Sequence, residues 1–299
     1  MENFFSATFL PFTLIVIMMG VGLSLTFQSF RNILFYPRAI SIGLVAQMVL
    51  LPLLALWIAD NSNMDPIYQV GLVLVAACPG GASAGLLNHL LRGNVALSIS
   101  LTSVNSFITL ATIPLITNFA LERYMGTEAA FSLPLGHTVR EIALMTLLPA
   151  FVGVLIRHYR PRFALAAEKP LKYIMPTLLA IAFVGIIFFE QKSGSDATHT
   201  FVDLILPNLW LNLGGMFGGY LLGLLFRLGP TSRMTISIEV GLQNSSLAIF
   251  VATTLLHAPQ MALVAVVYGS FTFVTAVAFG LGMYRLNRWL RMRLKRLNA

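Results

Sequence analysis

Nine long hydrophobic stretches, separated by short polar connections, make up most of the 299 residues. Each is close to the ~20 residues that a helix needs to cross the hydrocarbon core of a bilayer. Because lipid offers the backbone no hydrogen-bond partners, such stretches are expected to be helices. The sequence therefore predicts an all-α membrane protein with nine transmembrane helices, forming a single unit over residues 1–299. The predicted spans are residues 8–27, 39–59, 67–91, 95–118, 138–156, 174–190, 202–226, 234–256 and 261–283.

Two of these stretches are interrupted by residues that rarely stand inside a transmembrane helix. The third contains CPGGAS at residues 78–83, and the eighth contains SIEVGLQNSS at residues 237–246. Proline removes a backbone donor, and glycine relaxes the helix. Glu239 adds a carboxylate deep inside the eighth stretch, which costs about 2.5–3.5 kcal/mol on insertion scales. Paired interrupted spans with a buried acid indicate the binding site of a secondary transporter.

The interrupted spans are the third and the eighth of nine, and this spacing predicts an inverted repeat. An offset of five spans reverses the direction across the membrane. The first four spans are therefore expected to mirror the last four, with the fifth unpaired. Similarity between individual residues of the two halves is faint, so the repeat is inferred from the positions of the interruptions. In such repeats the two discontinuous helices cross, and the binding site lies near the bilayer midplane.

The polar groups at the interruptions suit a hard monovalent cation such as sodium. The carboxylate of Glu239 and the side chains of Gln243 and Asn244 supply oxygens, as do backbone carbonyls freed around Val240 and Leu242. A calcium site would hold more carboxylates. The half-helices that start after the interruptions turn positive ends into the protein, which favours an anionic group on a substrate. The pattern thus predicts a cation and an organic anion bound at the crossing.

Each of these polar residues also has a purely structural interpretation. Proline and glycine are common in membrane helices and more often mark a kink than a site. Asparagine, serine and threonine within spans often only bond a neighbouring helix. A single buried glutamate is different, because a structural role alone is costly to maintain. Glu239 therefore carries the functional prediction.

Composition agrees with the membrane class. The chain is 57% hydrophobic and 10% charged, with a mean hydropathy of +0.82, whereas about a quarter of the residues in soluble domains are charged. The net charge of +8 does not indicate nucleic-acid binding, because the basic residues lie between spans and at the C-terminus. The single cysteine, Cys78, excludes an internal disulfide framework and a multi-cysteine metal site. No basic segment precedes the first stretch, so it is expected to be a span and not a cleaved signal peptide.

The distribution of lysine and arginine predicts the orientation of the chain. With the N-terminus outside, all of the 19 basic residues except Arg123, Arg140 and Lys192 fall on the inner side. Residues 284–299 are strongly basic and are expected to form a cytoplasmic tail on the anionic inner leaflet. The sequence thus predicts a multi-pass protein of the plasma membrane, which in a bacterium is the inner membrane.

At these residues the chain resembles the bile acid:sodium symporter family, in its nine-span, bacterial-type form. The matching motifs are CPGG at 78–81 followed by RGNVALS at 92–98, IEVGLQNS at 238–245, AQMVLLP at 46–52 and MMGVGLSL at 18–25. The resemblance covers essentially the whole chain and implies two domains. The core would comprise residues 39–118 plus 202–283, with both crossing helices, and the panel residues 8–27 plus 138–190.

The resemblance also implies an activity and its site. An organic anion, such as a bile acid or a smaller carboxylate, would be imported with sodium by alternating access. Sodium site 2 would consist of Gln47, Glu239, Val240, Leu242 and Gln243. Sodium site 1 would use Ser98, Thr102 and Glu239. The serine–asparagine pair that the family adds to site 1 is replaced here by Ala84 and Gly85, which carry no side-chain oxygen. The implied substrate contacts are Ala82, Ser83, Asn244 and Ser245.

Other functions stay open at this point. The same fold could couple transport to protons through Glu239, or could export anions, and the loss of side-chain oxygens at Ala84 and Gly85 keeps this alternative alive. An intramembrane enzyme would need a second acid or a nucleophile–base pair, and a receptor would need an output domain. Sodium is expected as the coupling ion, without an organic cofactor. The expected partners are the organic anion and the lipid bilayer, with no nucleic acid and no obligatory protein partner.

Overall fold

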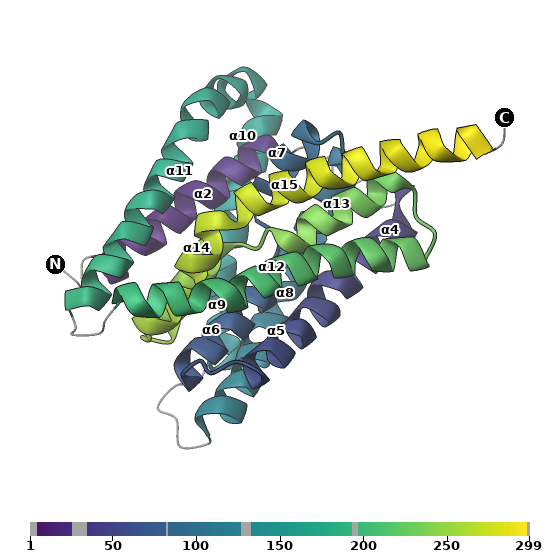
Figure 1. Cartoon of the computed structure of the whole chain (residues 1–299). Coiled ribbons are helices and arrows are strands. Elements are labelled where there is room, and N and C mark those ends of the chain that lie inside the picture. Colours follow the sequence, from purple (N-terminus) through teal and green to yellow (C-terminus); the bar gives the residue numbers. More distant parts are fainter. Residues whose placement is uncertain (1–4, 26–34, 82, 127–132, 193–196, 298–299) are drawn as a thin grey trace.

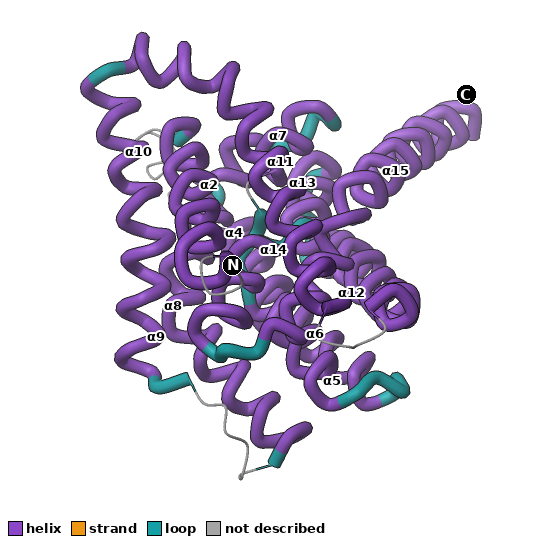
Figure 2. Tube along the Cα trace, turned by 90° about the vertical axis from the view of Figure 1, so that its left-hand side faces the viewer, coloured by secondary structure: helices purple, strands orange, loops and turns teal. Residues whose placement is uncertain are grey.

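The computed structural model describes residues 5–25, 35–81, 83–126, 133–192 and 197–297. Within these ranges all regular secondary structure is helical except one isolated bridge between two extended residues, as Figure 2 shows. Each hydrophobic stretch predicted from the sequence falls on helices, so the prediction of an all-helical protein is confirmed.

The helices follow one another with short connections (Figure 1). Those written η are single π-helical turns. In chain order they are η1 (Phe5–Phe9), α2 (Leu10–Ser24), α4 (Pro37–Val45), η3 (Ala46–Leu50), α5 (Leu51–Asp60), α6 (Pro66–Ala77), α7 (Ser83–Leu90), α8 (Val95–Met125), α9 (Leu135–Ile142), η4 (Ala143–Leu147), α10 (Leu148–Tyr159), α11 (Pro161–Lys192), α12 (Ala197–Leu225), α13 (Pro230–Gly241), α14 (Ser245–Phe250), η5 (Val251–Leu255) and α15 (Pro259–Leu297).

Five continuous helical segments of the described chain are long and apolar enough to cross a membrane. A sixth is α11, if its two parts, which meet at 43°, count as one span. Two shorter apolar helices, Pro66–Ala77 and Ser245–Leu255, belong to the interrupted stretches. The chain is therefore a multi-pass membrane protein. The five segments are Ala7–Ser24, Pro37–Asp60, Val95–Met125, Leu135–Tyr159 and Pro259–Arg285.

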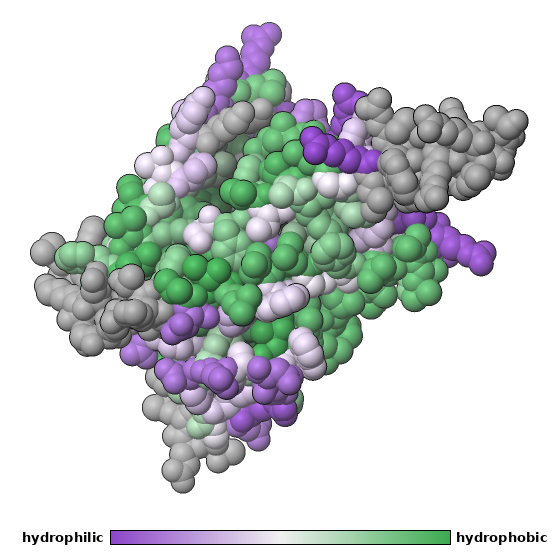
Figure 3. All heavy atoms as spheres, in the orientation of Figure 1, coloured by the Kyte–Doolittle hydropathy of each residue, from purple (hydrophilic) through white to green (hydrophobic). Residues whose placement is uncertain are grey.

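The outer surface agrees with a membrane environment. Large apolar side chains such as Phe12, Trp57, Phe107 and Trp210 are more than half exposed. Figure 3 shows hydrophobic residues across the middle of one face and hydrophilic residues gathered toward its margins. In water such a continuous apolar surface would drive association. In a bilayer it contacts lipid tails at no cost.

The helices fall into two groups by packing. α2 packs mainly against α10 and α11, and these three helices lie together at the upper left of Figure 1. The other group contains α6, α8, α12, α13 and α15, with α12 against α13 and α6 against α8 and α15. Every residue from Val70 to Ala77 in α6 and from Met234 to Gly241 in α13 is buried. The helices that lead into the interruptions are thus shielded from lipid by protein, as non-helical backbone at membrane depth requires.

Glycines allow α2 and α10 to approach backbone to backbone. A Cβ atom placed on Gly22 would lie 2.8 Å from Ala150 Cα and still closer to its carbonyl oxygen. A Cβ on Gly153 would lie 2.7 Å from the backbone nitrogen of Leu23. Small residues that permit such contact are the usual basis of helix association in membranes. Gly22 is therefore a packing residue of the contact between α2 and α10.

One ion pair joins the ends of α5 and α8. Arg123 donates from Nη2 to Asp60 Oδ2 at 2.8 Å and from Nε to Asp60 Oδ1 at 3.2 Å. The hydroxyl of Tyr124 also donates to Asp60 Oδ1, at 2.8 Å. The two charged side chains are 46% and 37% exposed, so the pair contributes at most about 1 kcal/mol. It holds together two helix ends that the charge distribution places on the same side of the membrane.

Replacing Gly22 by alanine is expected to lower the thermal unfolding temperature of the detergent-purified protein. The added methyl group collides with the backbone of Ala150, and forced overpacking costs about 1–3 kcal/mol. Gly282→Ala is the matched control, because a Cβ there meets nothing within 4 Å. Equal unfolding temperatures for the two variants would contradict the close contact between α2 and α10.

Candidate functional site

The two interruptions lie against each other and pair through their backbones. The first runs between the end of α6 at Ala77 and the start of α7 at Ser83, and the second between Gly241 and Ser245. Gly80 and Gln243 form an antiparallel bridge. The amide of Asn244 donates to the Pro79 carbonyl at 2.9 Å, and the amide of Gly81 donates to the Leu242 carbonyl at 2.5 Å. Each unwound segment thus supplies the hydrogen-bond partners that lipid cannot offer.

The two glycines of the first interruption are required by close approach. A Cβ on Gly80 would lie 2.7 Å from Glu239 Oε2 and 3.2 Å from Gln47 Nε2. A Cβ on Gly81 would lie 3.0 Å from the carbonyl oxygen of Gln243. The first interruption therefore lies directly against the Glu239 carboxylate, and a side chain at Gly80 would collide with it.

Glu239 is fully buried and is held by two hydroxyl groups of α8. Ser98 Oγ donates to its Oε1, and Thr102 Oγ1 donates to its Oε2 at 2.8 Å. Residues four apart share one face of a helix, which is why a single helix can bond both carboxylate oxygens. In the part of the chain that the structure describes, no lysine, arginine or histidine pairs with Glu239. The carboxylate is therefore solvated by neutral donors only.

Gln47 approaches Glu239 from the opposite helix. It lies in the π turn η3 (Ala46–Leu50), and its Nε2 donates to the backbone carbonyl of Glu239 at 2.9 Å. Asn105 Nδ2 in turn donates to Gln47 Oε1 at 2.9 Å. Pro52, just after the turn, cannot donate to the preceding helical turn and crowds it. A π turn absorbs this irregularity, and such turns are frequent at functional sites.

Two buried amide oxygens of this region have no hydrogen-bond partner among the described residues. Gln243 Nε2 donates to the carbonyl of Val240 at 2.7 Å, and its Oε1 is buried without a donor. Asn105 Oδ1 is buried in the same way. A buried acceptor left without a donor costs about 1–3 kcal/mol. Both atoms therefore favour an electropositive ligand in their neighbourhood.

The available donor set fits a hard cation better than a transition metal. The oxygens come from a carboxylate, hydroxyls, side-chain amides and backbone carbonyls, the kind preferred by alkali and alkaline-earth ions. The described residues contain no group of three or more histidine, cysteine, aspartate or glutamate side chains that could hold a metal. With one carboxylate in the network, a monovalent ion balances the charge.

The predicted substrate residues lie at the starts of the two half-helices. Ser83 is the first residue of α7 and is half-buried, and Ser245 is the first residue of α14 and is buried. Asn244 has a structural role that the sequence did not predict. Its Oδ1 accepts from the amide of Leu247 at 3.1 Å and so caps α14. Ala82 lies outside the described residues.

Three further polar residues of this region were not predicted as part of the site. Asn212 Nδ2 and the Tyr268 hydroxyl both donate to the carbonyl of Gly241, at 2.6 and 2.8 Å. They satisfy the carbonyl that the end of α13 frees. Asn88 Nδ2 donates to Ser98 Oγ at 3.1 Å. Their partners are distant in sequence, so no local pattern could have identified them.

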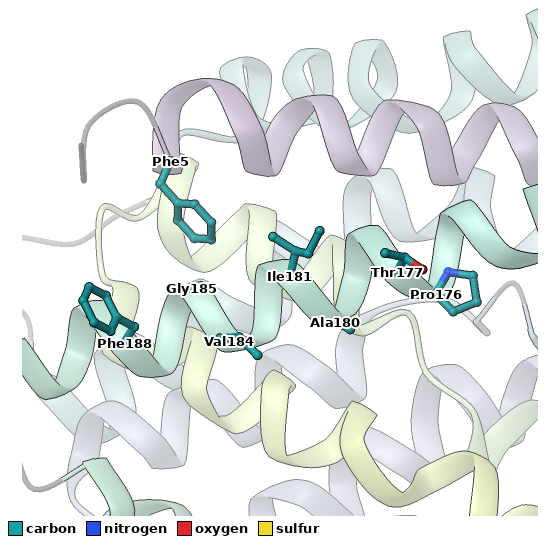
Figure 4. Close-up of a pocket in the computed structure, with 8 residues that line it drawn as sticks. All are labelled: Phe5, Pro176, Thr177, Ala180, Ile181, Val184, Gly185 and Phe188. Atoms are coloured by element: carbon teal, nitrogen blue, oxygen red, sulfur yellow. The ribbon is translucent and has the colours of Figure 1, made fainter.

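A cavity elsewhere on the protein does not overlap with this network. It has a volume of about 690 Å³ and is lined by Phe5 and by residues of α11 that are apolar except for Thr177. Figure 4 shows Ile181 and the rings of Phe5 and Phe188 around it. Its walls carry no charged group and none of the predicted site residues. The buried network around Glu239 therefore remains the candidate site.

Helices broken at one point around a buried carboxylate define a multi-pass membrane protein of the transporter class. The sequence comparison gives the family. The profile of the Sodium Bile acid symporter family matches residues 11–194, which is more than half of the chain. The chain therefore belongs to the sodium bile acid symporter family, a family of transporters and not of enzymes.

Individual relatives come from plants, bacteria and animals. The chain is 30% identical over 244 residues to the probable sodium/metabolite cotransporter BASS1, chloroplastic, of Arabidopsis thaliana, which covers 80% of this chain and 58% of the plant protein. It is 27% identical over 240 residues to the uncharacterized sodium-dependent transporter YocS of Bacillus subtilis. The aligned region covers 80% of this chain and 71% of the bacterial protein. It is 25% identical over 239 residues to the hepatic sodium/bile acid cotransporter of Rattus norvegicus. The aligned region covers 78% of this chain and 64% of the rat protein. The chain thus spans little more than half the length of its plant relative.

Replacing Gly80 by alanine is expected to destabilise the protein by about 1–3 kcal/mol, because the methyl group displaces the Glu239 carboxylate from its donors. Thermal unfolding in detergent measures the loss. Gly85→Ala is the control from the adjoining half-helix, since a Cβ there meets only Ser98 Oγ, at 4.0 Å. A Gly80→Ala protein as stable as the Gly85→Ala protein would show that the carboxylate does not lie against the first interruption.

Proposed function

We propose that this protein is a sodium-coupled symporter that imports an organic anion by alternating access. The observation that carries this proposal is the setting of Glu239. Its carboxylate is buried and receives only neutral donors in the described part of the chain. Gln243 of the second interruption and Asn105, which bonds Gln47, each have a buried amide oxygen without a donor in that part of the chain. A buried charge without a counter-charge is costly, and a cation that binds reversibly removes this cost.

Two sodium ions would share the carboxylate. Site 2 would use the side chains of Gln47 and Gln243 with the carbonyls of Val240 and Leu242, and the unpaired Oε1 of Gln243 supports it. Site 1 would use the hydroxyls of Ser98 and Thr102, both of which already contact Glu239. A hydroxyl oxygen that donates its proton to the carboxylate keeps lone pairs for the cation.

Cation binding and anion binding would be coupled through the crossing. A cation beside Glu239 neutralises the carboxylate, which otherwise repels an anionic substrate. The starts of α7 and α14, with Ser83, Asn244, Ser245 and Ala82, would then bind the anion at positive helix ends. Because coupling between two ligands is reciprocal, the anion would in turn raise the affinity for sodium.

The remaining features of the proposal concern architecture. Nine spans would cross the membrane as an inverted repeat, with the N-terminus outside and the basic tail of residues 284–299 on the cytoplasmic leaflet of the plasma membrane. The panel would be the group formed by α2, α10 and α11, and the core the group around α6, α8, α12, α13 and α15. Helices pack more densely within each group than between the groups, and this supports a rocking motion of one against the other.

The substrate would be a bile acid or a smaller organic anion. Relatives carry names that specify bile acids or unspecified metabolites, and the positive half-helix ends suit a carboxylate or sulfonate of either size. A thermal-shift screen of purified protein against such anions, in sodium and then in potassium, is expected to give stabilisation by the true substrate that is larger in sodium.

Glu239→Gln is expected to abolish sodium-driven uptake into proteoliposomes, because glutamine keeps the shape but not the charge that binds the ion. The assay follows the anion selected by the screen, with taurocholate as the bile-acid probe, with and without an inward sodium gradient. Gln47→Ala is expected to give a partial loss, because one of several ligands is removed.

His89→Ala is the control, since this exposed residue of α7 lies away from the carboxylate, and its uptake is expected to equal that of the unchanged protein. Sodium-driven uptake that survives in Glu239→Gln would refute the role of the carboxylate. Uptake that follows a proton gradient and ignores sodium would establish the proton-coupled alternative instead.

A further inference from the structure

Asn88 links the first half-helix to the carboxylate through a chain of hydrogen bonds. It lies on α7, is completely buried, and donates from Nδ2 to both the Ala84 carbonyl and Ser98 Oγ, each at 3.1 Å. Ser98 in turn donates to Glu239. This series of hydrogen bonds therefore runs from α7 through α8 to α13, where it ends at the Glu239 carboxylate.

The turn of α7 before Asn88 contributes no polar side chain to this series of hydrogen bonds. Ala84 is buried and apolar, and Gly85 has no side chain. A Cβ placed on Gly85 would lie 4.0 Å from Ser98 Oγ and meet nothing else within that distance. A side chain at position 85 would thus point toward Ser98 Oγ, and the space between them is unfilled. The polar group that α7 gives to Ser98 comes instead from Asn88, about one helical turn further along.

The chemistry of a hydroxyl group shows what this bond does. Serine has one proton to donate and two lone pairs with which to accept. In this structure the Ser98 hydroxyl donates its proton to a hydrogen bond with Glu239 Oε1, and one of its lone pairs accepts from Asn88 Nδ2. This leaves one lone pair. Without the bond from Asn88, the Ser98 hydroxyl is held by its bond to Glu239, and the direction of its remaining lone pair is less fixed.

We propose that Asn88 is a positioning residue of the cation site around Glu239, and that it fixes the Ser98 hydroxyl with its last lone pair free for sodium. The inference rests on the proposed sodium coupling. It means that α7 contributes to the ion site in this chain although Ala84 and Gly85 cannot.

Asn208 provides a matched comparison within the same protein. It is completely buried on α12, donates from Nδ2 to the carbonyl four residues earlier, and has a buried Oδ1 without a partner. Asn88 shares all three properties. The difference is the additional bond from Asn88 to Ser98. Leucine at either position keeps the approximate shape and removes the amide, so both variants lose the same generic bond.

The test is a sodium titration of the full-length protein in detergent. Thermal unfolding is followed as sodium chloride replaces potassium chloride at constant ionic strength, and the half-saturating sodium concentration is read from the stabilisation. Asn88→Leu is expected to raise this concentration about fivefold, the effect of losing one hydrogen bond of ~1 kcal/mol. Asn208→Leu is expected to leave it unchanged, although both variants unfold at a lower temperature in potassium alone.

A second variant tests the geometry. Gly85→Ser in the Asn88→Leu background adds a hydroxyl group in the open space beside Ser98, and it is expected to restore part of the sodium affinity. Should Asn88→Leu fail to fold, Asn88→Ala serves in its place, because alanine favours the helix of α7. The expected shift in half-saturating sodium is the same for both variants.

The outcomes separate this inference from the proposed function. An Asn88 variant with the half-saturating concentration of the unchanged protein would overturn the inference and leave sodium coupling standing. An equal shift in Asn208→Leu would also overturn it, because the effect would then come from lost stability. If sodium does not stabilise the unchanged protein more than potassium does, the proposed function fails and the inference fails with it.

Discussion

The energetic cost of burying the Glu239 carboxylate governs the rest of the site. A charge at this depth needs several donors or a counter-charge, and the described residues around it supply neutral donors. Two hydroxyls of α8 bond its oxygens, and Gln47 bonds its backbone carbonyl. Three helices from distant parts of the sequence therefore converge on one acid. This convergence fixes where α8 and the η3 turn must pack around the carboxylate.

The second constraint is the backbone itself. Two helices end near the middle of the bundle, and each end frees amides and carbonyls that lipid cannot satisfy. In this structure the freed groups are satisfied by direct pairing between residues 79–81 and 242–244. The Gly241 carbonyl also accepts hydrogen bonds from Asn212 and Tyr268. The same arrangement brings Gly80 against the carboxylate. The breaks and the acid are thus one structural unit, because neither would be tolerated in this form without the other.

The sequence predicted the helices and both interruptions, because hydrophobic length, proline, glycine and a lone acid are local signals. The side chains that meet at Glu239 were predicted from the resemblance to the family. The i, i+4 spacing of Ser98 and Thr102 already implied a shared face. It did not predict the capping role of Asn244, the π turn at Gln47 or the bond from Asn88 to Ser98. These depend on contacts between segments that are far apart in the chain or on the turn that Pro52 imposes, and an isolated pattern does not record which polar residues face each other.

The bridge between Pro79–Gly81 and Leu242–Asn244 is made of main-chain atoms. Main-chain hydrogen bonds do not depend on the identity of the flanking side chains, except that glycine is needed where the two segments approach most closely. The side chains at the starts of α7 and α14 can therefore vary without loss of these main-chain hydrogen bonds. Side-chain chemistry at the starts of α7 and α14 can thus differ between proteins of this architecture while the paired backbone between them stays the same.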